Sequence, residues 1–477
     1  SFFAIPNPAW TPPLEESGGT LPPPRPTPSP TRALRPLPSP SPRPKVEASP
    51  VPRATPKASS AERVETLSAL WRRFVKAYDR RQAGACEEVL SELRARHPKS
   101  LAAGAARGLL AFLREDYEGA YELLEALDAE ALEAEQRHWR RDRALVRAAF
   151  YTKHYPEARV VAQRLSEQPR KVWTTLIDGP FRGRYPHAAE ALEQLSEQGS
   201  YRVLTDVGIP PQELAALEAR LAKQDPKARA RLVAKVRKRH KVLGTLGDVL
   251  EAAKKAYGTL LQTGRPKAIY PSVYVFRDQE AFTRFNEAIG SGTSEHTLGY
   301  YWSPYRILVF FERSGRPELT VETVEVLLHE AFHQWLDLHV AGAPTWFNEG
   351  MAEFFAIGGK ISRKSLEFGN VPTRHPSRLD NIRSALGGSL SKPWPLSRLL
   401  LADHSSFMET HGAVNYAHSW SFVHYLGMHS GRRKLLVRYF KELAGGADQQ
   451  AAFDAVFGAL DLKKIEQDWR TYVLQLK

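Results

Sequence analysis

The chain has 477 residues, of which 42% are apolar and 25% are charged, as in an ordinary globular protein with a sizeable core. No window reaches the roughly 18 consecutive apolar residues that a bilayer-spanning helix needs. The single cysteine, Cys86, excludes an intramolecular disulfide framework and any cysteine-rich zinc module.

The formal net charge of +14 is concentrated in two segments. Residues 1–60 contain seven Lys/Arg and three Glu, and residues 227–241 contain eight Lys/Arg and no acid. The second run also carries Leu232, Val233 and Val236, so it predicts a solvated basic helix with a narrow apolar stripe, or alternatively a helix that docks on an anionic surface. Because no zinc-finger spacing or RNA-recognition motif accompanies it, nucleic acid is not expected as a partner.

Residues 1–60 hold 18 of the 35 prolines and little that can be buried. This composition predicts a disordered, Pro-rich tether. No signal-peptide pattern is visible. Long leaders of this kind often space an exported domain from its anchor, so the tether favours an exported or cell-envelope-associated bacterial protein without assigning a compartment.

Residues 61–198 have a repetitive helical pattern. Four segments carry small, aromatic or apolar residues at offsets 0, 3, 7 and 10, which lie on one helical face. They are Ala83/Cys86/Leu90/Leu93, Tyr117/Ala120/Leu124/Leu127, Tyr155/Ala158/Ala162/Leu165 and Tyr185/Ala188/Leu192/Leu195. The period is typical of helix-turn-helix solenoids, and the stretch resembles degenerate tetratricopeptide repeats, which implies a protein partner on the repeats. Plain helical-bundle packing is the alternative. Either way, Cys86 is expected to fill a packing position in the core.

The pattern changes after Ser200. Residues 201–205, 269–276 and 305–311 are β-branched and aromatic runs of strand length, and almost everything from Val321 onward has a helical pattern. Strands followed by helices predict an α+β, mostly helical protein, with one domain over residues 199–477 built around a small sheet. The run at residues 305–311 is also a candidate edge strand for an extended peptide.

A histidine pair in the segment from Val321 to Phe355 predicts a metal site. His329 and His333 belong to an H-E-x-x-H motif within a helical apolar pattern. Residues four apart lie one above the other on a helix, so both imidazoles can reach one ion. Glu330 is about 100° around the helix from His329, beside the ion, which suits a base acting on water.

A second helix beginning at Pro344 supplies the third candidate ligand. Glu349 follows His333 by 16 residues, and a catalytic zinc site needs three protein ligands and one open position. Glu353 lies one turn further and is expected to hold the far nitrogen of a ligating histidine, with a capping or solvated acid as the alternative. Asp337 is a weaker candidate for that task, and His339 is expected to be structural.

The H-E-x-x-H motif followed by N-E-G-x-A-E resembles the gluzincin peptidases, the thermolysin-like and aminopeptidase-N-like clan. The resemblance implies a zincin fold with His329, His333 and Glu349 as ligands of one Zn²⁺ and Glu330 as the general base. The segment from Asn415 to Leu426 is similar to one whose leading tyrosine stabilises the oxyanion in aminopeptidase-N-like enzymes.

That similarity points to Tyr416 as the oxyanion donor, with His418 as the alternative. The last 280 residues also look like bacterial peptidase-MA-like domains. The G-x-M-E-N segment that holds a substrate's α-amine in aminopeptidase-N-like enzymes is absent from the corresponding region, 299–312. The choice between endopeptidase and exopeptidase therefore stays open.

The sequence as a whole predicts a zinc metallopeptidase acting on a peptide or protein substrate. The competing interpretation is a non-catalytic interaction protein whose helical repeats bind a partner and whose zinc site is a relic kept for stability. The intact set His329, Glu330, His333 and Glu349 favours the enzyme, because a structural site does not require a free Glu330 and usually closes its fourth position.

Overall fold

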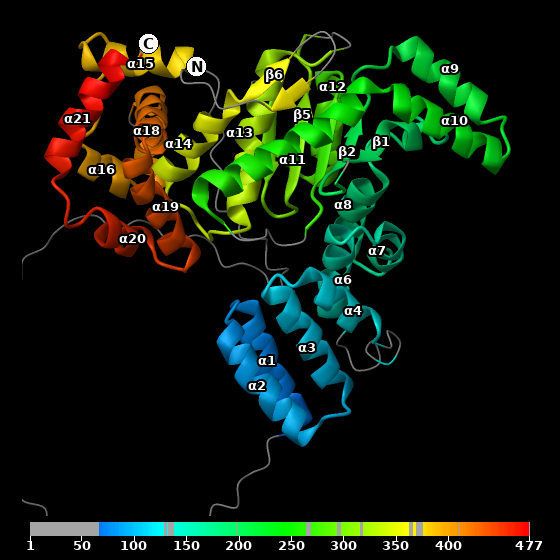
Figure 1. Ribbon diagram of the computed structural model, residues 1–477. Helices are drawn as coiled ribbons and strands as arrows, with labels where there is room; N and C mark the ends of the chain where they lie inside the picture. The colour runs from blue at the N-terminus through cyan, green and yellow to red at the C-terminus, as the bar shows by residue number, and fades with distance from the viewer. Residues whose placement is uncertain are drawn as a thin grey trace, which may run out of the picture. The chain divides into compact units, whose positions relative to one another are not determined.

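The structure, a computed structural model, describes residues 66–127, 131, 138–196, 198–263, 269–292, 297–314, 318–361, 366–368, 375–409 and 411–476 (Figure 1). The tether expected over residues 1–60 lies outside this described part. The chain from Leu67 onward forms one compact unit, mostly helical with a small mixed five-stranded sheet. This architecture confirms the predicted fold class, α+β and mostly helical with a small sheet.

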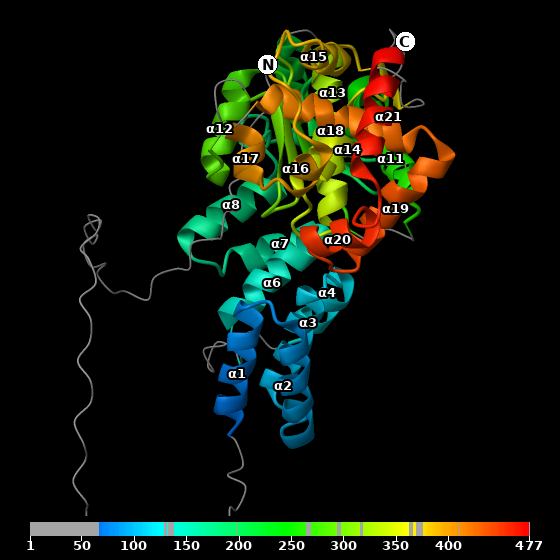
Figure 2. The same cartoon turned by 90° about the vertical axis from the view of Figure 1, so that its left-hand side faces the viewer.

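The first described helices follow one another as a stack in which each packs on the next (Figures 1 and 2). They are α1 (Leu67–Asp79), α2 (Ala83–Arg96), α3 (Leu101–Leu113), α4 (Tyr117–Glu125), α6 (His138–Tyr151), α7 (Tyr155–Ala162) and α8 (Glu167–Asp178). Ser100 and Asp116 cap α3 and α4 by accepting backbone N–H bonds from Ala103 and Gly119. Gly108 lets α3 approach α4 closely, because an added Cβ would lie 2.5 Å from Leu124.

Three of the four expected repeat segments fall on helices, namely α2, α4 and α7, and most of their members are buried. Cys86 is fully buried, and burial raises the pKa of its thiol to about 11. The expectation that the fourth segment, Tyr185 to Leu195, forms a helical repeat is wrong. This segment contains a short 3₁₀ helix, η1 (Ala189–Leu192), followed by a strand in which Leu195 is exposed. Gly179 ends α8 with a φ of +76°, and Pro180 follows it, so the solenoid pattern stops there.

The sheet has the strand order β1-β2-β3-β5-β4. Its strands are β1 (Glu193–Leu195), β2 (Arg202–Thr205), β3 (Ser272–Phe276), β4 (Gly299–Trp302) and β5 (Ile307–Phe311). Strands β2, β3 and β5 are parallel, whereas the outer strands β1 and β4 run antiparallel to their neighbours. The boundary expected between residues 198 and 199 thus falls in the short connection between the paired strands β1 and β2. The run at 305–311 contributes the interior strand β5, so the expectation that it forms an edge is wrong. The edge strand next to β5 is β4, and β1 forms the opposite edge of the sheet.

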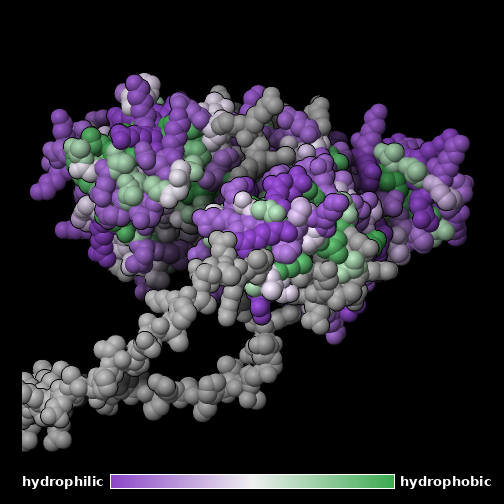
Figure 3. Space-filling model, turned by 90° about the horizontal axis from the view of Figure 1, so that it is seen from below, coloured by the Kyte–Doolittle hydropathy of each residue, from purple (hydrophilic) through white to green (hydrophobic). Residues whose placement is uncertain are grey.

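Four helices are interleaved with the strands. They are α9 (Pro211–Leu221), α10 (Pro226–Arg239), α11 (Lys241–Leu261) and α12 (Gln279–Ile289). The basic run lies on α10, where Val233 is buried while Lys227, Arg231, Lys235 and Lys238 are exposed. The pair α9–α10 is at the right in Figure 1, and the same region carries mainly hydrophilic side chains in Figure 3. This agrees with the expected solvated basic helix.

The secondary structure described after β5 is helical except for the antiparallel pair β6 (Gly359–Ile361) and β7 (Leu366–Phe368). Its helices are α13 (Val321–Asp337), α14 (Thr345–Ala356), α15 (Pro376–Leu386), α16 (Leu396–Leu401), α17 (His404–Glu409), α18 (Gly412–Gly427), α19 (Ser430–Ala444), α20 (Gln449–Val456) and α21 (Leu462–Gln475). Helix α14 packs against both α13 and α18. Among the described helices, none is long and apolar enough to cross a membrane.

Candidate metal centre

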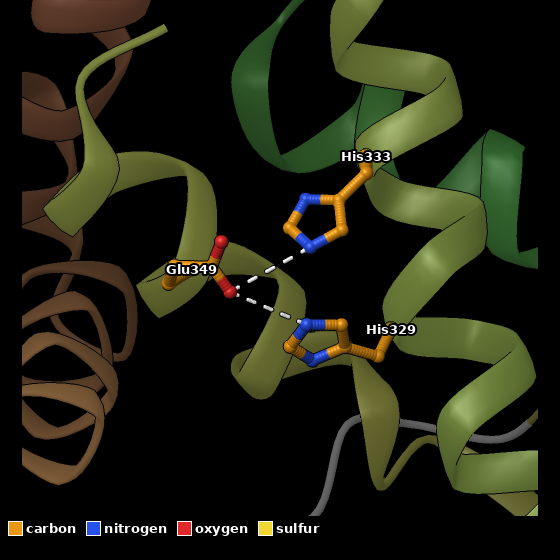
Figure 4. A group of neighbouring side chains, drawn as sticks. All are labelled: His329, His333 and Glu349. Carbon is orange, nitrogen blue, oxygen red and sulfur yellow. Dashed lines mark ion pairs between the residues drawn. The ribbon is translucent and has the colours of Figure 1, made fainter. Parts of the chain in front are cut away.

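Helix α13 presents the two histidines of the H-E-x-x-H motif on one side. Thr320 caps its start by accepting the backbone N–H of Thr323 at 3.3 Å. The apolar residues Leu327, Leu328 and Ala331 are buried, and the helix packs against β4, β5 and α14. This packing fixes the rotation of α13, and His329 and His333 lie on the side that faces α14 (Figure 4).

Helix α14 brings Glu349 to the same place. The helix begins after Pro344, whose missing N–H costs nothing at that position. Gly350, the next residue after Glu349, lies against α18, where an added Cβ would come within 2.7 Å of the Ser419 carbonyl oxygen. The close approach of α14 to α18 therefore fixes the helix that carries the carboxylate.

The three side chains converge on one point (Figure 4). Glu349 Oε2 lies 3.3 Å from His329 Nε2 and 3.6 Å from His333 Nε2. One ligand atom from each residue lies within 4.8 Å of the others, so the group can bind a metal ion. Ligand atoms about 2.1 Å from a shared ion at a tetrahedral angle are roughly 3.4 Å apart. The two observed separations agree with that spacing, and the N, N, O donor set is one that zinc accepts.

Two members of the cluster are buried, and the third, His333, is half-buried. His329 is 5% exposed and Glu349 is 9% exposed. Burial works to lower the pKa of His329, but the bond to Glu349 and the neighbouring carboxylates raise it to about 9. Burial likewise opposes ionisation of Glu349, yet the two histidines hold its pKa below the usual value. The surroundings therefore favour a positive charge at the point where these three side chains meet.

A second layer of side chains orients the histidines. Asn348 Oδ1 lies 2.7 Å from His333 Nδ1, so the amide oxygen can accept that N–H and leave Nε2 to act as a ligand. Glu353 Oε1 lies 3.5 Å from His329 Nδ1. Glu353 is the residue expected to back a ligating histidine, and its position is compatible with that role.

Glu353 is itself held by Arg378 of α15 and by His375, the residue before that helix. Arg378 donates two hydrogen bonds to Glu353, at 2.8 and 2.6 Å, and His375 Nε2 lies 3.2 Å from Glu353 Oε2. Burial opposes the charge on Glu353, but Arg378 and His375 hold the pKa of this carboxyl well below its usual range. Glu353 thus carries a stable negative charge behind His329.

Glu330 lies beside the ligand group and not within it. Its Oε2 accepts the backbone N–H of Tyr301, on strand β4, at 2.9 Å. The carboxylate thus faces the edge of the sheet while the neighbouring His329 faces α14. This is the separation of ligand and base that the 100° turn between successive helical residues predicts.

Tyr416 lies on α18 and is 6% exposed. Its hydroxyl is 3.8 Å from Met408 Sδ, and the Arg378 guanidinium carbon lies 5.3 Å from the centre of its ring. Burial raises the pKa of Tyr416 well above its usual value, and the charges of Glu349 and Glu353 act in the same direction. The phenol is therefore a neutral hydroxyl in the neighbourhood of the cluster.

His418, the alternative oxyanion donor, points elsewhere. It is two residues from Tyr416, about 200° around the helix, and its ring stacks on Trp469 of α21 at 4.2 Å. Burial lowers the pKa of His418 to about 3. His339 contacts Trp335, with Nδ1 2.9 Å from the carbonyl oxygen of that residue, as expected of a structural histidine.

Four residues near the cluster were not predicted from the sequence, namely Asn348, His375, Arg378 and Tyr301. Asn348 was detectable in principle, since it directly precedes Glu349 within the recognised motif. The other three come from distant segments without any local pattern. Asp337, a candidate for backing a histidine, instead accepts the Tyr301 hydroxyl at 2.7 Å and lies 3.7 Å from Arg306 Nε.

Comparison with known proteins adds one match. Residues 322–447 match a family described as "Protein of unknown function (DUF1570)". The matched stretch holds the candidate ligands His329, His333 and Glu349 together with Glu330 and Tyr416. No curated protein and no solved structure matches the chain.

Proposed function

We propose that the protein is a zinc-dependent peptidase in which His329, His333 and Glu349 hold one Zn²⁺. The observation that carries the proposal is the convergence of three donors at ligand spacing, 3.3 and 3.6 Å from the shared Glu349 oxygen, with the Glu330 carboxylate beside them. A metal kept only for stability does not need a neighbouring carboxylate that is not one of its ligands. The thermolysin-like zincin fold is part of this proposal.

Bound zinc would supply Lewis acidity, which polarises a scissile carbonyl and makes water acidic near neutral pH. Glu330 takes the proton of the attacking water and delivers it to the leaving amine. General acid–base work of this kind typically contributes about 10²–10⁴-fold to the rate. The Tyr301 amide holds one carboxylate oxygen of Glu330, which restricts the orientation of the group.

Tyr416 donates a hydrogen bond to the oxyanion that develops on the carbonyl. A donor has to keep its proton at working pH, and the raised pKa of Tyr416 ensures that it does. The resemblance to aminopeptidase-N-like enzymes supports the assignment.

Strand β4 supports a peptide as the substrate. It is the edge strand next to α13, and Tyr301 places this edge beside Glu330. An extended peptide can add to such an edge through main-chain hydrogen bonds. We therefore assign the peptide-pairing edge to β4 and not to the segment at 305–311, whose strand β5 is interior.

The test is metal analysis and digestion of a peptide library by the full chain, with Glu330→Gln in parallel. Glu322→Gln, an exposed acid in the first turn of the same helix, is the matched control. We expect about one zinc per chain in all three proteins and at least a hundred-fold lower cleavage with Glu330→Gln alone. Retained cleavage in Glu330→Gln, or a wild-type chain that binds no zinc, would overturn the proposal.

A further inference from the structure

The edge strand β4 contacts the face of α13 that carries Glu330. Glu330, Gln334 and Asp337 lie within about 60° of one another around the helix. Each meets the β4–β5 hairpin. Glu330 accepts the Tyr301 amide at 2.9 Å, Gln334 donates to the Arg306 carbonyl at 2.8 Å, and Asp337 accepts the Tyr301 hydroxyl at 2.7 Å. Tyr301 thus binds α13 twice, once through its backbone and once through its side chain.

The contact between Tyr301 and Asp337 continues to Arg306. This residue lies in the turn between β4 and β5 with a φ of +52°, a conformation that non-glycine residues seldom adopt. Its Nε is 3.7 Å from Asp337 Oδ2, and its side chain is only 11% exposed. A guanidinium withdrawn from water to this extent depends on its acidic neighbours, so Arg306 and Asp337 hold each other in place.

Arg306 also reaches the first helices of the chain. Its guanidinium forms an ion pair with Glu115, in the turn between α3 and α4, and lies 5.6 Å from the centre of the Tyr117 ring. Glu115 has a φ of +62°, so a second non-glycine residue in the left-handed region sits at this junction. Unusual backbone conformations on both sides of an ion pair persist only where the surroundings determine them.

We propose that Glu115, Arg306, Asp337 and Tyr301 form a chain of positioning residues through which the α3–α4 turn orients Glu330. These contacts run from the α3–α4 turn, through the β4–β5 turn, to the Tyr301 amide that binds Glu330. The proposal rests on the proposed function in one respect, namely that Glu330 acts on water. The contacts themselves do not depend on catalysis, so one part of the test, hydrogen exchange at the Tyr301 amide, needs no activity.

The kinetic arm compares Tyr301→Phe with Tyr300→Phe in the full chain. Both changes remove a hydroxyl from β4, but Tyr300 donates to Asn286 at 2.7 Å, outside the chain of contacts. With a fluorogenic peptide chosen from the library digest, Tyr301→Phe should lower kcat about ten-fold, leave KM within about two-fold and keep one zinc. Asp337→Asn, which retains an oxygen for the Tyr301 hydroxyl, should recover more activity than Asp337→Leu.

The structural arm measures hydrogen exchange at the Tyr301 amide and needs no substrate. Exchange should accelerate in Glu330→Ala, in Tyr301→Phe and in Glu115→Ala. It should stay unchanged in Glu118→Ala, which removes a nearby acid on α4 that lies 3.5 Å from His154 instead. Glu115 and Glu118 lie in the α3–α4 turn and on α4, outside the sheet, so a failure of Tyr301→Phe to fold would not prevent the measurement in these two variants.

Equal kcat values for Tyr301→Phe and Tyr300→Phe, or equal exchange at the Tyr301 amide in Glu115→Ala and Glu118→Ala, would overturn the proposal and show that these contacts only contribute to packing. A wild-type chain that cleaves no peptide would contradict the proposed function. In that case, exchange at the Tyr301 amide alone decides the coupling. Acceleration in Glu115→Ala supports the chain of positioning residues, and unchanged exchange refutes it.

Discussion

Arg378 holds Glu353 with two hydrogen bonds, at 2.8 and 2.6 Å, directly behind the candidate ligand His329. Both charges are largely withdrawn from water, and the pair comes from helices that are separated by β6 and β7 in the sequence. Burying an ion pair costs desolvation free energy, and removing one partner leaves the other charge buried without a counterion. Its main value is to keep a fixed negative charge next to the imidazole.

Replacing Arg378 with Met should therefore weaken both the fold and the metal site. We expect a loss of about 3–5 kcal/mol in unfolding free energy because Glu353 loses its buried partner. Zinc affinity should fall about 10–100-fold because His329 loses its fixed neighbour. Urea unfolding and competition with a chromophoric chelator measure the two effects. Arg383→Met is the control, since Arg383 on the same helix binds the carbonyl of Val473 and should affect stability alone.

Removing the amide behind His333 should lower zinc affinity without unfolding the protein. Asn348→Ala takes away the acceptor of the His333 Nδ1 proton, so the ring loses its preferred tautomer and orientation. We expect about 10–100-fold weaker zinc binding in a chelator competition. Asn348→Asp keeps an acceptor oxygen and should bind within a few-fold of wild type. Equal weakening by both substitutions would contradict the role given to Asn348.

His333→Ala should abolish stoichiometric zinc binding, because two remaining donors do not make a zinc site. His339→Ala is the matched control, one histidine exchanged for alanine near the end of the same helix. It should retain about one zinc per chain when measured by atomic emission. A His333→Ala variant that holds zinc as tightly as wild type would disprove the ligand assignment.

Acid should destabilise the protein through His418. Burial lowers the pKa of this histidine to about 3, whereas an unfolded chain protonates it near 6.5. Between these two values the unfolded state binds the extra proton, so stability rises with pH across that window and is lost as pH falls. From pH 6.5 to 4.5 the loss is on the order of 2 kcal/mol. His418→Phe, which keeps a ring against Trp469, should flatten this part of the pH profile of unfolding.

The metal-site geometry was predictable where it follows from one helix or from two neighbours in sequence. The spacing of His329 and His333 dictates their common face, and the short connection to α14 favours an antiparallel approach by Glu349. Arg378 and Tyr301 were not predictable, because nothing local in their segments indicates that Arg378 reaches Glu353 on α14 or that β4 lies beside α13. Such contacts follow from tertiary packing alone.

The fold was predicted less completely than the site. The runs at 201–205, 269–276 and 305–311 became β2, β3 and β5, since apolar runs of strand length suit the interior of a sheet. Strand β4 was not recognised, because four residues of Gly, Tyr and Trp carry too little periodicity. The fourth repeat was predicted wrongly because the 0, 3, 7, 10 spacing recurs after Gly179 and Pro180, where α8, the last helix of the N-terminal stack, has ended.

The pairing of β1 with β2 limits how this protein can be divided. Glu193 on β1 accepts Arg202 Nε at 2.7 Å, and the same guanidinium binds the carbonyls of Leu176 and Ile177 at the end of α8. A fragment beginning at residue 199 would remove β1 from one side of β2 and leave the buried Arg202 guanidinium without its counterion Glu193. Expression of the half that carries the candidate metal centre by itself should therefore yield aggregated material. Truncations intended to isolate it need to retain α8.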